Sequence, residues 1–336
     1  MKENASIQFG ILGGGRIGRM HAENIMYRIR DAQLSAVYDP FIEHLEEWAV
    51  NHSLTCLTNE ENDVLQNPDI DAVLICSPTH THADFAIKAA KCGKHIFCEK
   101  PVDLDIKRIQ EVKAVMDQSS VVFQVGFNRR FDKSFEKLKS TIVSGEVGDV
   151  QIIKVTSRDP MPPPLNYVEN SGGLFLDMTI HDFDMVRFLS GSEFVNVHAY
   201  GQAVIDPSLS EHGDIDTAVT SGVLENGALV VIDNSRKASY GYDQRIEVFG
   251  SEGKAVVENM RPTTIEVSTN EGVYKDKPEY FFLERYKESF VTEIESFISA
   301  IKNQYPSAVS VDDGLKAAEI AVAATRSLQQ KKKLLV

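Results

Sequence analysis

Three polar side chains stand out in the otherwise apolar segment GGLFLDMTIHDFDM. Asp177, His181 and Asp184 follow one another at spacings of four and three residues. At about 100° per residue, these spacings place all three on one narrow face of a helix. Apolar residues flank that face on both sides, which is typical of a buried helix. Buried ionisable groups are costly unless they are paired or solvated, so we expect this stripe to face a partner, water or a bound polar molecule.

A second chemical pattern lies near the start of the chain, where IQFGILGGGRIG carries Gly13, Gly15 and Gly18. The spacing Gly-x-Gly-x-x-Gly, after a predicted strand and at the start of a helix, is typical of dinucleotide sites. The first glycine permits a tight turn, the second admits a pyrophosphate, and the third lets the helix pack on the strand. The phosphates would lie on N–H groups at the helix N-terminus. A glycine turn that binds no nucleotide is the alternative.

Asp39, at the end of the second predicted strand, indicates which dinucleotide is bound. A carboxylate at this place accepts hydrogen bonds from the adenosine ribose hydroxyls and repels a 2′-phosphate. The following residues, Pro40 and Phe41, offer no cation to hold that phosphate. We therefore expect NAD rather than NADP.

The residue spacings exclude two other kinds of catalytic site. No tyrosine is followed four residues later by lysine, and the four cysteines form no compact set of zinc ligands. His80 and His82 near Cys76 raise the possibility of a metal, but helix capping and nucleotide contact are the preferred interpretations. We expect no bound metal, so any chemistry needs another acid or base.

Alternating strands and helices must position these groups in the first part of the chain. This alternation predicts βαβ units and a Rossmann-type, doubly wound parallel sheet over residues 1–127. Thr81 with Asp84 predicts a capping box, and Gly93 is placed to end the same helix. The motifs CSPTHTH, CEKP and VGFNRRF end or follow three predicted strands, at the edge where such sheets bind ligands. The predicted strands are 7–12, 33–38, 54–57, 71–76, 94–98 and 121–126.

The pattern changes after Asp149, where successive strands with short turns such as Asn226-Gly227 predict an antiparallel sheet. We expect residues 128–336 to form an α+β substrate and oligomerisation domain with a large, mainly antiparallel open sheet. Its C-terminal helix is a candidate to pack on the first domain. An uncovered apolar face of such a sheet often serves as an interface between subunits. The predicted strands are 150–156, 194–204, 216–224, 228–234, 245–250, 254–258 and 264–268, and the predicted helices are 281–302 and 314–330.

Composition narrows the class of partner. The formal net charge of −14 argues against nucleic acid and provides no bulk attraction for phosphorylated substrates. We therefore expect a small, neutral substrate. No apolar run approaches the ~20 residues that cross a bilayer. The first residues show no secretory signal, so we expect no membrane partner and a cytoplasmic location.

The chain resembles the Gfo/Idh/MocA oxidoreductases over essentially its whole length, and among them the inositol 2-dehydrogenases. The pattern specific to the family is EKP followed by D-x-x-x-H. The segments that carry the resemblance are the glycine loop, SPTHTH, EKP, VGFNRRF, SRDP, GGLFLDMTIHDFDM and YGYD.

This resemblance implies NAD-dependent oxidation of a ring hydroxyl, as in myo-inositol to 2-keto-myo-inositol, by a dimer or tetramer. It implies that Lys100, Asp177 and His181 form the catalytic group. His181 would take the hydroxyl proton, Asp177 would bind a hydroxyl or orient the imidazole, and Lys100 would hold the reacting oxygen. Which of Lys100 and His181 is the immediate base stays open. The expected cofactor-binding residues are Gly13, Gly15, Arg16, Ile17, Gly18, Asp39, Ser77, Thr79, His82, Glu99 and Lys100. The expected substrate-binding residues are Arg129, Ser157, Asp159, Asp177, His181, Tyr240 and Tyr242.

Several alternatives remain at this stage. Arg129 has a structural salt bridge as its other role, and Asp184 has a buried pairing with a neighbouring domain or subunit. Some members of the family carry histidine where this chain has Ser157, so polyol contacts on that side are expected to differ. Scyllo-inositol, glucose, xylose or an anhydro-sugar are alternative substrates. A non-catalytic, nucleotide-sensing protein would lack the lysine or the histidine, and both are present here.

Overall fold

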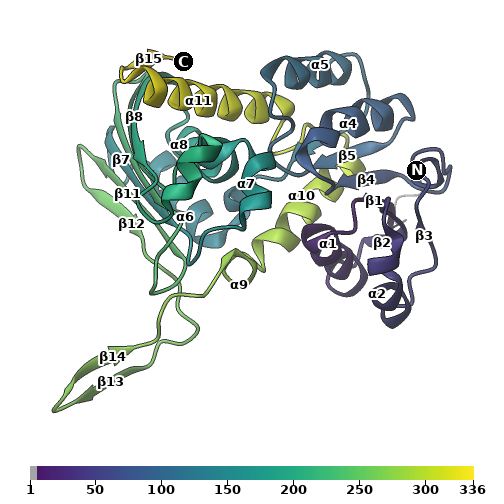
Figure 1. The fold of residues 1–336 in the computed structure, drawn as a ribbon, viewed down its shortest axis with the longest axis horizontal. Helices are drawn as coiled ribbons and strands as arrows, with labels where there is room; N and C mark the ends of the chain where they lie inside the picture. Colours follow the sequence, from purple (N-terminus) through teal and green to yellow (C-terminus); the bar gives the residue numbers. More distant parts are fainter. Residues whose placement is uncertain (1–5) are drawn as a thin grey trace. The chain divides into compact units, whose positions relative to one another are not determined.

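The computed structural model describes residues 6–336. Residues 1–5, on which the prediction of no secretory signal partly rests, lie outside the described residues. The chain divides into two compact units, shown with their elements in Figure 1. The first unit comprises Met1–Asn128 and Glu288–Lys316, and the second comprises Arg129–Lys287 and Ala317–Val336. The segment 288–316 therefore groups with the nucleotide-binding part of the chain.

The first unit contains a parallel sheet with the strand order β3-β2-β1-β4-β5-β6. The order reverses between β1 and β4, and this switch point is where doubly wound sheets bind ligands. The prediction of a doubly wound parallel sheet is confirmed. The strands are β1 (Ile7–Leu12), β2 (Ala32–Tyr38), β3 (Leu57–Thr58), β4 (Ala72–Ile75), β5 (His95–Cys98) and β6 (Phe123–Val125).

Helix α10 (Ser289–Asn303) supplies one side of the core of the first unit. Its residues Ile294, Phe297 and Ile298 are buried in one cluster with Phe9 of β1. The Phe9 and Phe297 ring centroids lie 6.3 Å apart. The predicted helix 281–302 is in fact broken into α9 (Phe282–Arg285) and α10. The remaining helices of this unit are α1 (Arg16–Tyr27), α2 (Glu46–Asn51), α3 (Asn62–Leu65), α4 (His82–Lys91) and α5 (Ile106–Met116).

The predicted capping box at Thr81 is wrong. The Thr81 hydroxyl donates to the Pro78 carbonyl at 2.7 Å and lies 2.6 Å from the Ser77 Oγ. A 3₁₀ turn, Thr79–Thr81, leads directly into α4, and the Thr81 backbone is already helical. A capping residue needs an extended backbone to turn its side chain toward the N–H groups of the first turn. Gly93 follows the end of α4 with φ of 72°, as expected of a glycine that closes a helix.

The second unit contains a sheet with the strand order β12-β11-β7-β10-β9-β8-β15. Among the strand pairs described for this second sheet, only β7–β10 is parallel, so the prediction of a mainly antiparallel sheet is confirmed. A separate hairpin of β13 (Glu266–Thr269) and β14 (Gly272–Lys275) projects from this unit (Figure 1). The strands of the larger sheet are β7 (Val150–Arg158), β8 (Phe194–Gln202), β9 (Thr217–Leu224), β10 (Leu229–Ser235), β11 (Asp243–Gly250), β12 (Lys254–Val257) and β15 (Leu334–Leu335).

Helices cover one face of this second sheet. Helix α8 (Ile180–Ser190) contacts β7, and α6 (Lys133–Val143) contacts both α8 and β12. Burial alternates along β10, where Val230 and Ile232 are buried while Leu229 and Val231 are exposed. The opposite face of the sheet is therefore the exposed one. The remaining helices are α7 (Leu165–Ser171) and α11 (Val311–Gln330), of which α11 begins within the first unit and ends within the second. Within residues 6–336, no helix has the length and apolar character that a membrane span requires.

Candidate active site

The glycine loop connects β1 to α1 in the first unit. Gly13 has φ of 106°, and a Cβ there would lie 2.5 Å from the Ser77 backbone nitrogen. A Cβ on Gly18 would lie 1.9 Å from the Gly13 carbonyl oxygen. A Cβ on Gly15 would instead have no neighbouring heavy atom within 4 Å. Packing thus requires two of the glycines, and the third leaves the room that a pyrophosphate needs at the start of α1.

Asp39 joins the end of β2 to this loop. Its Oδ2 accepts a hydrogen bond from the Gly14 N–H at 2.9 Å, and its Oδ1 accepts one from the Phe41 N–H at 3.0 Å. The side chain is largely buried. These contacts fix the carboxylate beside the loop, where a ribose hydroxyl of a bound dinucleotide could donate to it.

His82 links the loops that follow β4 and β5. Its Nδ1 lies 2.8 Å from the Pro101 carbonyl oxygen, and its Nε2 lies 2.7 Å from the Ser77 carbonyl oxygen. The ring is buried, and burial lowers the pKa of His82 although both carbonyls favour its charged form. Both ring nitrogens face the backbone, so the geometry favours a structural role over the expected nucleotide contact.

Two glycines and a π-helical turn position the polar segment of the second unit. Gly172 and Gly173 have φ of 80° and 82°, and the π-helical turn Phe175–Thr179 follows before α8 begins. The Leu174 N–H at the start of this turn donates to the Asp214 Oδ1 at 2.9 Å. A π turn changes the rotation per residue, and such turns are frequent at functional sites. The sequence predicted one regular helix and missed both the turn and Asp214.

The three side chains of the predicted stripe do not share one environment. Asp177 and His181 are partly exposed, whereas Asp184 is almost fully buried. The Arg130 guanidinium donates to Asp184 twice, with Nε–Oδ2 at 2.9 Å and Nη2–Oδ1 at 2.6 Å. The prediction of a single stripe is therefore wrong for Asp184. Its alternative role as a buried ion-pair partner is the observed one, with the partner in the same unit.

Asp177 is held by two side chains. The Arg236 Nη1 donates to its Oδ2 at 2.9 Å, and the Tyr167 hydroxyl donates to its Oδ1 at 2.8 Å. Arg236 is almost fully buried. Burial disfavours the charged guanidinium, but the carboxylates of Asp177, Asp159 and Asp214 together raise the pKa of Arg236. The sequence missed Arg236, because nothing in its local context separates it from a surface arginine.

A buried network surrounds Asp182, the residue after His181. The Arg129 Nη1 donates to the Asp182 Oδ1 at 2.6 Å, and the Asn234 Nδ2 donates to the Oδ2 at 2.7 Å. Burial raises the pKa of Asp182, while the Arg129 charge acts in the opposite direction. Arg129 also donates to the Ser157 Oγ and the Tyr242 hydroxyl, each at 3.4 Å. This arrangement is the structural salt bridge that was the alternative role of Arg129.

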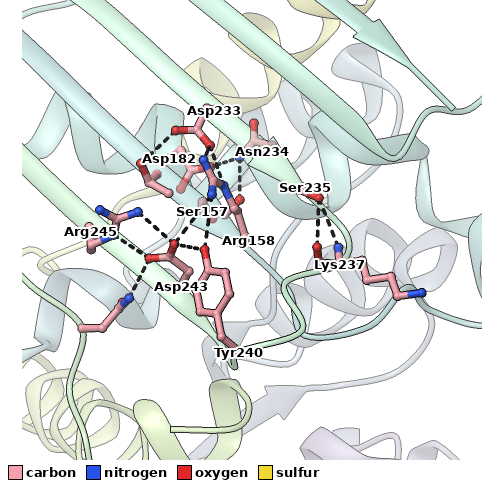
Figure 2. A network of polar contacts seen from close by, with 12 residues as sticks. Ser157, Arg158, Asp182, Asp233, Asn234, Ser235, Lys237, Tyr240, Asp243 and Arg245 are labelled. Carbon is pink, nitrogen blue, oxygen red and sulfur yellow. Dashed lines mark hydrogen bonds and ion pairs between the residues drawn. The ribbon is translucent and has the colours of Figure 1, made fainter. Parts of the chain in front are cut away.

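Tyr240 lies in a different network, on the exposed face of the sheet (Figure 2). Its hydroxyl donates to the Asp243 Oδ2 at 2.5 Å and accepts from the Arg158 Nη1 at 3.2 Å. The Arg158 Nε donates to the Asp233 Oδ1 at 2.7 Å. Tyr240 is 40% exposed, whereas Tyr242 is 5% exposed, so the two tyrosines do not line one common surface.

Asp159 follows the end of β7 directly. Its backbone N–H donates to the Ser235 carbonyl at 2.9 Å, and its carbonyl accepts from the Ala238 N–H at 2.6 Å. These backbone contacts continue the pairing of β7 with β10 and hold the loop before Tyr240. The placement of Asp159 is therefore set by its backbone.

Taken separately, the two units offer complementary chemistry. The first has a strand–glycine loop–helix arrangement with an acidic residue beside it, which is the form of a dinucleotide site. The second presents a carboxylate and an imidazole, partly exposed, on an otherwise buried segment, and such groups can exchange protons with a substrate. Together they define a nucleotide-dependent oxidoreductase.

Comparison with known families agrees with this class. Residues 7–127 match an oxidoreductase family with an NAD-binding Rossmann fold, and residues 135–256 match the GFO/IDH/MocA C-terminal domain. The chain belongs to the Gfo/Idh/MocA oxidoreductase family, and its cofactor is NAD. Both predictions are confirmed.

Individual relatives cover nearly the whole chain. It is 51% identical over 319 residues to an uncharacterized oxidoreductase, YrbE, of Bacillus subtilis (95% of this chain, 93% of the relative). It is 44% identical over 326 residues to a myo-inositol 2-dehydrogenase of Thermotoga maritima (97% of each chain). A crystal structure of scyllo-inositol dehydrogenase from Lactobacillus casei, with bound NAD(H) and scyllo-inositol, superposes with a TM-score of 0.92 at 32% identity (98% and 99% of the two chains).

Proposed function

We propose that the chain is an NAD-dependent inositol dehydrogenase that oxidises one ring hydroxyl of myo-inositol to a ketone. This proposal is based on the exposure of two side chains. Among the ionisable groups of the largely buried segment 172–185, only Asp177 and His181 are partly exposed. Its support from similarity is the 44% identity, over 97% of the chain, to a myo-inositol 2-dehydrogenase.

In this proposal, Lys100, Asp177 and His181 supply the catalytic groups. An imidazole nitrogen of His181 takes the proton of the reacting hydroxyl, either directly or after Lys100. Asp177 binds a neighbouring hydroxyl or orients the imidazole, and the ion pair with Arg236 fixes the direction of its carboxylate. Lys100 binds the reacting oxygen. Bound NAD⁺ supplies the acceptor for the hydride that leaves the same carbon.

We assign the remaining site residues by where they lie. We assign direct contact with the substrate to Asp177 and His181, because their side chains are partly exposed. Arg129, Ser157 and Tyr242 are buried and support α8 through Asp182 and its neighbours. The cofactor would lie on the glycine loop, with the ribose hydroxyls at the Asp39 carboxylate.

Scyllo-inositol is the second candidate substrate. It differs from myo-inositol in the orientation of one hydroxyl, and the relative that binds it shares 32% identity with this chain over 98% of its length. One carboxylate and one imidazole can bind the ring with that hydroxyl in either orientation, unless further contacts of the protein select one of the two.

We also propose that the protein is a homo-oligomer that uses the exposed face of the second sheet. Strand pairing brings the exposed apolar side chains of several strands onto that face, which is typical of an interface. The apolar side chains concerned are Val219, Leu229, Val231, Phe249 and Val256.

A cytoplasmic location fits the state of the thiols. Cys56, Cys76, Cys92 and Cys98 are all free. Proteins of oxidising compartments commonly pair their cysteines, whereas reducing compartments keep them as thiols. We therefore propose a cytoplasmic location.

The test of the catalytic proposal compares His181→Ala with the wild type. Loss of a general base lowers kcat by about 10²–10⁴-fold, so NADH formation from myo-inositol should fall by that factor while NADH binding is unchanged. The matched control is His212→Ala, which removes an exposed imidazole paired with Glu169. Full turnover by the His181 variant would contradict the proposed role.

A further inference from the structure

A buried cluster of titratable groups lies in the first unit, apart from the glycine loop. His21 of α1, Glu99 after β5 and Glu293 of α10 place one nitrogen and two carboxyl oxygens within 4.8 Å of one another. The His21 Nε2 lies 3.0 Å from the Glu99 Oε1 and 4.0 Å from the Glu293 Oε1. The side chains of His21 and Glu293 have no exposure, and that of Glu99 is 14% exposed.

Glu293 occupies an apolar environment within this cluster. Neither of its carboxyl oxygens has a hydrogen-bond partner among residues 6–336. The Phe97 and Phe290 rings meet the His21 ring edge-on, with centroids 5.4 and 5.8 Å away. Burial, followed by the negative charge of Glu99, raises the pKa of Glu293 well above its usual range. A proton on Glu293 removes the charge that this environment disfavours.

Glu99 depends on this cluster for its placement. On one side its Oε1 meets His21, and on the other a Cβ on Gly126 would lie 3.2 Å from its Oε2. Glu99 also directly precedes Lys100, at the carboxyl end of β5 where the sheet binds its ligand. Anything that draws His21 away from Glu99 would therefore disturb the cofactor edge of the sheet.

We propose that Glu293 is a positioning residue that carries a proton and thereby leaves His21 to hold the Glu99 carboxylate at the cofactor edge. An ionised Glu293 would compete with Glu99 for the same His21 nitrogen and would repel its charge. This proposal rests on the proposed function in one respect, namely that Glu99 contacts bound NAD.

The two buried thiols near the cluster favour their neutral form. Cys76 and Cys98 lie at the ends of β4 and β5, and burial, followed by the charge of Glu99, raises the pKa of both thiols. Asp103 acts on Cys98 from the loop after β5. Glu293 is thus the group of the cluster whose proton loss, as the pH rises, adds a negative charge beside Glu99.

The test is NADH affinity as a function of pH, measured by fluorescence titration of the wild type, Glu293→Gln and the exposed control Glu295→Gln. Coupling between a proton and a ligand is typically fivefold or more, so wild type and control should lose at least about fivefold affinity across the pH range in which Glu293 loses its proton, which lies well above the usual range of a carboxyl group. Glu293→Gln should keep its affinity across that range, because an amide mimics the protonated carboxyl and does not ionise. Parallel profiles, or weak binding by the Gln variant at every pH, would overturn the proposal.

A second measurement on the wild type keeps the test decisive if Glu293→Gln does not fold. Infrared spectroscopy should show a carboxylic acid C=O band that persists above neutral pH, where ordinary carboxyls are ionised. Absence of that band would overturn the proposal. So would stoichiometric bound metal whose removal by a chelator weakens NADH binding, because the cluster would then hold a cation rather than a proton. These readouts need no substrate, so they stay distinct from a failure of the inositol assignment.

Discussion

Burial separates the roles of ionisable side chains that lie only a few residues apart in one segment. Asp182 and Asp184 are buried and each is paired with an arginine, whereas Asp177 and His181 keep exposure and can meet a substrate. The sequence analysis grouped Asp184, rather than Asp182, with Asp177 and His181. Which carboxylate meets an arginine depends on tertiary packing, and local spacing does not contain that information.

Replacing Asp182 by asparagine should strongly destabilise the second unit. The change leaves the buried Arg129 guanidinium without its charge partner, which costs about 3–5 kcal/mol of unfolding free energy. Urea denaturation measures this loss. As a control, Glu247→Gln removes the surface ion pairs of Glu247 with Lys154 and Lys254 and should cost about 1 kcal/mol or less. Equal losses in the two variants would contradict the assigned roles.

At the scale of elements, alternating strands and helices were enough to predict the first sheet, and successive strands with short turns were enough to predict the second. Short strands such as β3 and β15 are fixed by pairing with a neighbour, so their own sequence carries little signal. The π-helical turn was missed because it depends on a shift of backbone hydrogen bonds, which apolar periodicity does not reveal. The break between α9 and α10 was missed because both halves carry helical patterns.

Two glycine variants should separate binding from folding in the loop before α1. Gly15→Ala adds a methyl group where the protein leaves open space, so it should fold normally yet bind NADH about tenfold or more weakly. Gly18→Ala forces a Cβ against the Gly13 carbonyl, and overpacking of this kind costs typically about 1–3 kcal/mol. Thermal unfolding and NADH titration measure the two effects. Normal NADH affinity in Gly15→Ala would contradict the placement of the pyrophosphate.

At the scale of the whole molecule, the exposed face of the second sheet is the candidate for subunit contact. A lysine at Val231 would place a charge in the middle of that face, and an unpaired charge is costly in a buried interface. We expect Val231→Lys to yield a smaller particle than the wild type in light scattering after size-exclusion chromatography. The control is Val50→Lys, which makes the same substitution at an exposed site in α2. An unchanged mass for both variants would exclude this face as the interface.

The most direct test of the account is the initial rate of NADH formation across myo-inositol, scyllo-inositol, glucose and xylose, with NAD⁺ and NADP⁺ in parallel. The account predicts turnover of an inositol, with NAD⁺ strongly preferred because Asp39 repels a 2′-phosphate. Preference for scyllo-inositol would keep the reaction and change the substrate. Turnover of glucose or xylose in place of either inositol, or no turnover despite measurable NADH binding, would contradict the central claim.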